Sequence, residues 1–149
     1  MKKLALTDFA KYRYPSALEL SPDSRYLTFA LKDVDREGDG YRWNLWLYDL
    51  ERRESRQITQ GDDQRKAVWE DNTHILYKTT EPDEALRARG FEEEWTVYHR
   101  LNVCTGEDRE AFRLPMSVSG LWKMDEGRYV FTGETHLDRP NLLELTGEA

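Results

Sequence analysis

The chain has 149 residues, of which 38% are hydrophobic and 34% charged, and its formal net charge is −7. That length supports one ordinary domain, and that balance of residues excludes wholesale disorder. An acidic chain repels phosphate backbones, so nucleic acid is not expected as a partner. Five Trp and eight Tyr, together with many β-branched residues, favour strands over helices.

The N-terminus and the cysteine content lead to an expected compartment. Two lysines followed by three apolar residues fall far short of a signal-peptide core. The sequence contains no apolar run of the length that a membrane span needs. A single cysteine, Cys104, cannot form an internal disulfide. We therefore expect a cytoplasmic protein with no membrane partner.

In chain order, the first predicted unit is a four-stranded blade over about residues 14–60, and Thr7–Tyr12 before it is compatible with a short helix. The charged segment Asp33–Gly40 is expected to be a solvated loop. The four strands are expected near Ser16–Leu20, Tyr26–Leu31, Leu45–Leu50 and Arg56–Thr59.

The second predicted blade covers about residues 66–115. Its helix is expected over Glu84–Arg89, because Thr80 and Asp83 fit a capping box and Gly90 suits the end of a helix. Its strands are expected near Ala67–Trp69, Ile75–Thr79, Thr96–Val103 and Glu110–Leu114.

A third, partial blade is expected over about residues 117–149. Its strands are placed near Val118–Trp122 and Tyr129–Thr132. Leu142–Leu145 is either a third strand or the lead into a helix.

A repeat connects the three units. Asp23, Asp71 and Asp125 each open a short polar turn before a strand rich in β-formers, with spacings of 48 and 54 residues. An aspartate in such a turn fixes the bend by accepting hydrogen bonds from backbone amides. Four strands in about 50 residues match the repeat of a propeller blade.

The strands of these units are apolar or aromatic on both faces. Leu45 and Leu47 alternate with Trp46 and Tyr48, so both sets are predicted to be buried between blades, on opposite faces of the sheet. The sequence thus predicts an all-β fold: a partial β-propeller of two four-stranded antiparallel blades and part of a third, with one or two short helices. Such a set of blades cannot close a ring, so its end faces predict self-association.

The first blade resembles a known family. The SPDG propeller repeat is recognised in Leu20–Asp23, Tyr26–Phe29, Asn44–Leu50 and Gln57–Thr59, with Ser24 at the usual glycine. That repeat occurs in TolB proteins and in the propeller of the prolyl oligopeptidase family. The insertion Asp33–Arg42 and the stretch Glu94–Tyr98 resemble acylaminoacyl-peptidase-like enzymes of that family.

The resemblance implies a function for the parent protein. In this family an N-terminal propeller covers the active site of a C-terminal α/β-hydrolase domain, which cleaves short or N-blocked peptides with a Ser-His-Asp triad. The sequence holds no Gly-x-Ser-x-Gly nucleophile elbow, so no catalytic residue is expected here. Its expected partners are the hydrolase domain and the peptide substrate. Two alternatives stay open: a TolB-like or lectin-like binding module, and a small protein that closes a propeller by oligomerising.

The candidate site residues are few. Glu93 and Glu94 are candidates for binding the α-amine of a substrate, as a Glu pair does in dipeptidyl-peptidase relatives; the other interpretation is a solvated loop. The histidines His74, His99 and His136 lack metal-ligand spacing, and we expect no metal and no cofactor. Cys104 is expected to be packed or on an edge strand, and Tyr41–Trp43 to combine core packing with a rim charge.

Overall fold

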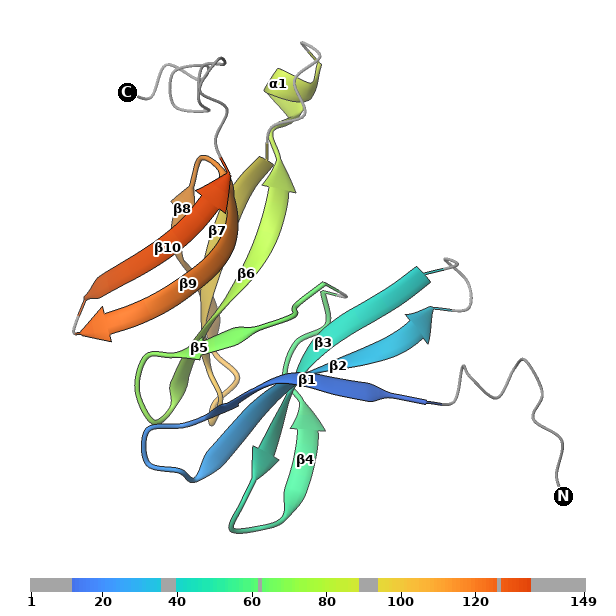
Figure 1. Cartoon of the computed structure of the whole chain (residues 1–149), viewed down its shortest axis with the longest axis vertical. Coiled ribbons are helices and arrows are strands. Elements are labelled where there is room, and N and C mark those ends of the chain that lie inside the picture. Colours follow the sequence, from blue (N-terminus) through green and yellow to red (C-terminus); the bar gives the residue numbers. More distant parts are fainter. Residues whose placement is uncertain (1–11, 36–39, 62, 89–93, 126, 135–149) are drawn as a thin grey trace, which may run out of the picture.

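The computed structural model describes residues 12–35, 40–61, 63–88, 94–125 and 127–134, and these form ten strands in three antiparallel sheets (Figure 1). Sheet 1 consists of four strands in sequence order: β1 (Tyr14–Leu20), β2 (Tyr26–Asp35), β3 (Gly40–Asp49) and β4 (Glu54–Gln57).

Sheet 2 repeats this order with the next four strands, and a short helix, α1 (Glu84–Arg87), lies between its second and third strands. The strands of sheet 2 are β5 (Ala67–Trp69), β6 (His74–Pro82), β7 (Glu94–Asn102) and β8 (Asp108–Leu114). Sheet 3 contains two described strands, β9 (Ser117–Asp125) and β10 (Arg128–Glu134). The all-β prediction of partial propeller blades is confirmed, and each strand placed from Ser16 to Thr132 overlaps an observed one.

Two of the three turn aspartates, Asp23 and Asp71, take the predicted role, whereas Asp125 accepts hydrogen bonds from the Arg128 side chain. Asp23 Oδ1 accepts hydrogen bonds from the Ser21 hydroxyl at 2.6 Å and from the Arg25 amide at 3.1 Å. Asp71 Oδ1 accepts from the amides of Thr73 and His74 at 2.7 and 2.8 Å. Burial alone would raise the pKa of Asp71, but these amide hydrogen bonds outweigh it and lower that pKa to about 2. The carboxylates therefore fix equivalent bends in sheets 1 and 2.

The loop predicted at Asp33–Gly40 is wrong at both ends. Strand β2 continues through Asp35 and β3 begins at Gly40, with Asp33 paired to Arg42. The charges do not break the strands, because they pair across them: Arg42 Nη2 lies 2.5 Å from Asp35 Oδ1. Residues 36–39 lie outside the described residues.

The predicted helix is shorter, and its predicted cap is wrong. Thr80 belongs to β6, where it pairs with Thr96 of β7, so it cannot cap a helix. The single turn α1 instead follows Asp83, whose carbonyl accepts the Arg87 amide at 2.8 Å. The helix end predicted at Gly90, the segment Thr7–Lys11 and the expected element Leu142–Leu145 lie outside the described residues.

The sheets pack face to face in sequence order, with β1 against β5 and β5 against β9. Between sheets 1 and 2 the core contains Leu45, Leu47, Ala30, Ala67, Trp69, Ile75, Tyr77, Leu101 and Val103. Between sheets 2 and 3 it contains Leu76, Tyr98, Val118 and Leu121. Sheet 2 is therefore covered on both faces, as a blade within a propeller is.

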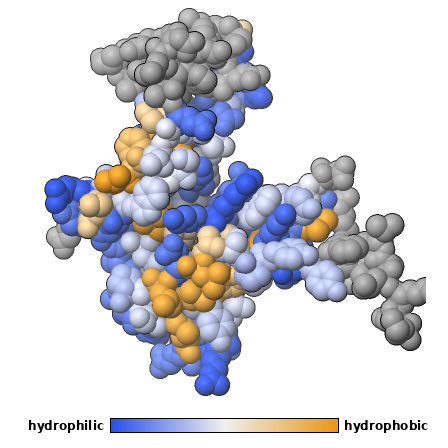
Figure 2. Space-filling model, in the orientation of Figure 1, coloured by the Kyte–Doolittle hydropathy of each residue, from blue (hydrophilic) through white to orange (hydrophobic). Residues whose placement is uncertain are grey.

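Sheet 1 differs from the prediction on its outer face. Trp46 and Tyr48 do lie on the face opposite Leu45 and Leu47, but they are half-exposed rather than buried. The reason is that sheet 2 covers one face of sheet 1, and no described element packs on the other. Leu20, which pairs with Leu27, is 54% exposed on that outer face. Figure 2 shows a hydrophobic area over β1 and the neighbouring end of β2.

Candidate functional site

The predicted amine-binding glutamates are not brought together by a described cavity. Glu94 is the first residue of β7, is exposed, and pairs in register with Pro82 at the end of β6. Glu93 lies outside the described residues. The role of this pair therefore stays a prediction.

His74 lies in β6, as predicted, and has a structural role. Its Nδ1 is 2.9 Å from Asp71 Oδ2, and its Nε2 is 3.1 Å from Asn102 Nδ2. Asn102 Oδ1 accepts the amides of Cys104 and Thr105, so the Asn102 nitrogen must donate to His74 Nε2. These contacts place a proton on His74 Nδ1, which donates to Asp71, and leave Nε2 as the acceptor.

His99 lies in β7 and is also held by structural contacts. Its ring is stacked on Tyr77 with centroids 5.3 Å apart, and its Nδ1 lies 3.3 Å from Asp108 Oδ1. Tyr77 donates its hydroxyl hydrogen bond to the same carboxylate of Asp108. Over the described ranges no three His, Cys, Asp or Glu side chains gather in a way that could hold a metal ion. His136 lies outside these ranges.

Two pockets occupy equivalent places at the junctions between sheets. The pocket between sheets 1 and 2, here the 1–2 pocket, has a volume of about 420 Å³. The pocket between sheets 2 and 3, here the 2–3 pocket, has a volume of about 440 Å³. Both lie at the end of the sheets where the turns β1–β2, β3–β4, β5–β6, β7–β8 and β9–β10 gather.

The 2–3 pocket is organised by the buried carboxylate of Glu70, which sequence reasoning did not single out. Arg100 donates to it from Nε and from Nη2, the latter at 2.7 Å, and Tyr129 donates its hydroxyl. Lys123 of sheet 3 donates to the Glu70 carbonyl. Arg100 belongs to the same sheet as Glu70, so the contacts of Tyr129 and Lys123 are the ones that join sheet 2 to sheet 3.

The electrostatics of this cluster favour the ion pair. Burial raises the pKa of Glu70, but the hydrogen bonds from Arg100 and Tyr129 outweigh it and leave that pKa below its ordinary value. The hydrogen bond to Glu70 raises the pKa of Arg100. Burial, followed by the hydrogen bond to Glu70, raises the pKa of Tyr129 to about 12. At neutral pH the cluster therefore holds one carboxylate, one guanidinium and one neutral phenol.

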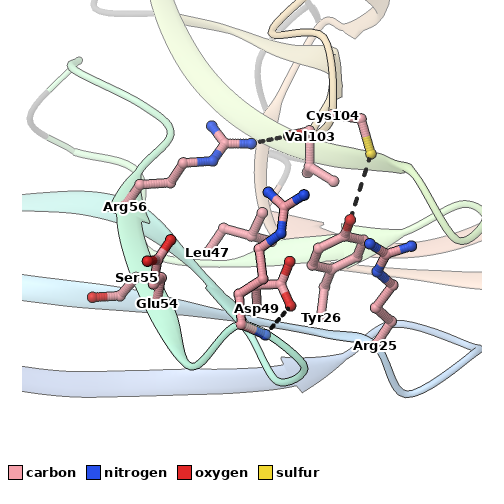
Figure 3. Close-up of a pocket in the computed structure, with 10 residues that line it drawn as sticks. Arg25, Tyr26, Leu47, Asp49, Glu54, Ser55, Arg56, Val103 and Cys104 are labelled. Atoms are coloured by element: carbon pink, nitrogen blue, oxygen red, sulfur yellow. Dashed lines mark hydrogen bonds between the residues drawn. The ribbon is translucent and has the colours of Figure 1, made fainter.

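The 1–2 pocket contains Cys104, whose predicted placement is wrong. Cys104 is exposed in the turn after β7, because Asn102 folds that turn by accepting the amides of Cys104 and Thr105. Figure 3 shows its thiol directed toward the Tyr26 hydroxyl, at a distance of 3.9 Å from sulfur to oxygen.

A signal for these pockets was present in the repeat. Arg56 pairs with Leu47 in sheet 1, and Arg109 pairs with Arg100 in sheet 2. Because Leu47 and Arg100 occupy the same repeat position, Arg56 and Arg109 are equivalent arginines on successive blades. Each of them lines its pocket.

No α-helix of the described chain is both long enough and apolar enough to span a membrane.

No protein-family model and no curated protein matches the sequence. Among solved structures, the chain is similar to the acylaminoacyl peptidase of Pyrococcus horikoshii, with a TM-score of 0.62 and 15% identity. The superposition covers 88% of this chain and 20% of the peptidase, so the chain spans about a fifth of that protein's length. At this identity the likeness concerns the fold alone. It is consistent with the propeller part of the peptidase, the fold that the SPDG repeat implied.

Proposed function

We propose that the chain is the non-catalytic propeller part of a serine peptidase that acts on short or N-blocked peptides. In this proposal the blades limit access to an α/β-hydrolase domain, which supplies the nucleophile. The observation that carries the proposal is the fold match, which covers nearly the whole chain but about a fifth of an acylaminoacyl peptidase. The absence of a nucleophile elbow from the sequence agrees with it.

The faces of the sheets also support this proposal. Sheet 2 is covered on both sides, whereas sheets 1 and 3 each carry large apolar side chains on a face that no described element covers. Further blades on either side would bury those faces in the way that sheet 2 is buried. A narrow propeller opening above a catalytic domain admits a short peptide and rejects a folded chain.

The test begins by sequencing the coding DNA for several hundred codons beyond the codon for Ala149. We expect a Gly-x-Ser-x-Gly elbow within an α/β-hydrolase pattern. The protein that joins residues 1–149 to this hydrolase domain, here the joined chain, should hydrolyse an N-acetylated aminoacyl nitroanilide. Replacement of the elbow serine by alanine should abolish this activity.

Gating has its own readout. Removal of residues 1–149 from the joined chain should widen the accepted peptides toward longer ones, because the blades no longer limit entry. If the joined chain hydrolyses long and short peptides at the same relative rates with and without these residues, gating is refuted. Reaction of residues 1–149 alone with a fluorophosphonate, lost on replacing one serine, would overturn the non-catalytic assignment.

A further inference from the structure

The 1–2 pocket has a shape and a lining that suit a small ligand. Its volume of about 420 Å³ lies within the range of small-molecule sites. It is lined by Arg25, Tyr26, Leu47, Asp49, Arg52, Glu54, Ser55, Arg56, Val103 and Cys104. Figure 3 shows Arg56 and Arg25 on opposite sides of this space.

The floor of the pocket is apolar and fixed in place. Leu47 and Val103 are buried members of the core between sheets 1 and 2. Tyr26 forms a wall, and its ring is stacked on Trp69 with centroids 6.5 Å apart. An apolar group placed against Leu47 and Val103 would lose its contact with water on one side at no cost in reorganisation.

The rim carries more positive than negative charge. Three arginines, Arg25, Arg52 and Arg56, face two carboxylates, Asp49 and Glu54. Asp49 Oδ1 already accepts the amides of Glu51 and Arg52 at 3.0 Å each. The pocket therefore has an excess of one positive charge on a chain whose net charge is −7.

The guanidinium groups of this rim are weakly neutralised. Arg56 donates to the Val103 carbonyl, which has no net charge. Arg25 lies 3.7 Å from Glu51, and both side chains are well exposed, so that pair is weak. The Arg52 side chain makes no hydrogen bond or ion pair within the described part of the chain, and it acts on Asp49, as Arg25 does, only through its charge.

The 2–3 pocket, at the equivalent place between the next two sheets, shows how arginine binds a carboxylate in this repeat. In the 2–3 pocket, Arg100 stands where the 1–2 pocket has Leu47, and it binds the internal carboxylate of Glu70 in a bidentate manner. At the position of Glu70 sheet 1 has Pro22, which has no carboxylate. The 1–2 pocket thus lacks both members of this ion pair: an apolar floor at Leu47 replaces Arg100, and the arginines of the pocket stand at its rim.

We propose that the 1–2 pocket binds a small organic carboxylate that carries an apolar side chain. The carboxylate lies against Arg52 and Arg56, because a planar guanidinium fork matches a carboxylate in geometry and charge. The apolar side chain lies on Leu47 and Val103. This inference does not rest on the proposed function, since it uses the junction between sheets 1 and 2 alone.

The test titrates the full chain, labelled with ¹⁵N, with three probes. N-acetyl-L-leucine carries both features, N-acetyl-L-leucinamide lacks the carboxylate, and inorganic phosphate lacks the apolar group. We expect saturable shifts of the Val103 and Cys104 amides with N-acetyl-L-leucine. The Kd should be at least about tenfold weaker for N-acetyl-L-leucinamide, which loses a charge-assisted hydrogen bond, and for phosphate, which loses the apolar contact.

Variants locate the carboxylate. Arg52→Gln should weaken N-acetyl-L-leucine about tenfold while leaving the fold intact, because the Arg52 side chain makes no hydrogen bond or ion pair within the described part of the chain and acts on Asp49 only through its charge. Arg53→Gln in the same turn is the matched control, since Arg53 does not line the pocket, and it should bind as the unmodified chain does. Equal affinity for N-acetyl-L-leucinamide or phosphate, equal loss in both variants, or no saturable shift would overturn the proposal.

Discussion

Glu70 is expected to stabilise the junction between sheets 2 and 3, where it pairs with Arg100 of its own sheet and accepts a hydrogen bond from Tyr129 of sheet 3, and its replacement by alanine tests this directly. Its side chain is 9% exposed, and it accepts hydrogen bonds from Arg100 and Tyr129. The change would leave the Arg100 guanidinium without a partner carboxylate. Breaking a buried ion pair costs about 3–5 kcal/mol, but Arg100 is 33% exposed and water recovers part of this. We expect a loss of about 2–3 kcal/mol in the free energy of unfolding at pH 7.

Urea unfolding followed by tryptophan fluorescence measures this loss. Glu70→Gln should cost less than Glu70→Ala, because the amide oxygen still accepts one hydrogen bond. Arg128→Ala is the matched control, since Arg128 forms a bidentate pair with Asp125 in which its side chain is 78% exposed. That exposed pair should contribute less than about 0.5 kcal/mol. A Glu70→Ala cost as small as that of the control would refute the role of Glu70.

The pH dependence gives a second check on the same residue. The pKa of Glu70 is lowered in the folded chain, because the hydrogen bonds from Arg100 and Tyr129 outweigh the effect of burial. The stabilisation is therefore complete above the unfolded pKa of about 4.3 and is lost as the pH falls through the lower folded value. The difference between Glu70→Ala and the unmodified chain should shrink below pH 4. A difference that stays constant down to pH 3 would contradict the ion-pair assignment.

Four further predictions concern single residues. Ser24 has a φ of 60°, so Ser24→Gly should raise the free energy of unfolding by about 1 kcal/mol in the same urea assay; a loss would be contrary to the turn geometry. Leu45→Ala should cost about 2–5 kcal/mol because Leu45 is fully buried, whereas Trp46→Ala, on the half-exposed face, should cost about 1–2 kcal/mol; the reverse order would disprove the assignment of faces. The ¹⁵N shifts of His74 should report a proton on Nδ1 at pH 8, and a proton on Nε2 would contradict the hydrogen-bond network. The chain should dimerise at micromolar concentration in sedimentation equilibrium, and Leu20→Asp on the outer face of sheet 1 should shift it to monomer; a well-folded unmodified monomer at high micromolar concentration would argue against pairing of these faces.

The local features of this fold were readable from the sequence. Asp23 and Asp71 act on amides two and three residues away, so a short motif contains the whole interaction. The strand positions follow from runs of β-formers between such turns. The prediction of the helix cap was wrong because threonine is favoured both in strands and at helix caps, and the pairing of Thr80 with Thr96 places it in a strand. The loop at Asp33 failed for the same reason, since Arg42 supplied a cross-strand partner.

The Glu70 cluster could not be read in this way. Glu70 is separated by 30 residues from Arg100 and by 59 residues from Tyr129. No period or spacing connects a residue in the turn after β5 with one residue on β7 and one on β10. The half-exposure of Trp46 also depends on whether another sheet lies beside it, and an alternating pattern does not contain that information.

The two interfaces of sheet 2 should respond to different changes of solvent. The interface with sheet 1 is held by packed apolar and aromatic side chains, including the stacked rings of Tyr26 and Trp69. Such contacts weaken on cooling, because apolar hydration becomes less unfavourable. The interface with sheet 3 adds the hydrogen bond from Tyr129 to the ionised Glu70 carboxylate, which is protonated in acid. Low temperature and low pH should therefore loosen opposite ends of the same chain, and amide exchange would show protection lost first in β1–β4 in the cold and first in β9–β10 in acid.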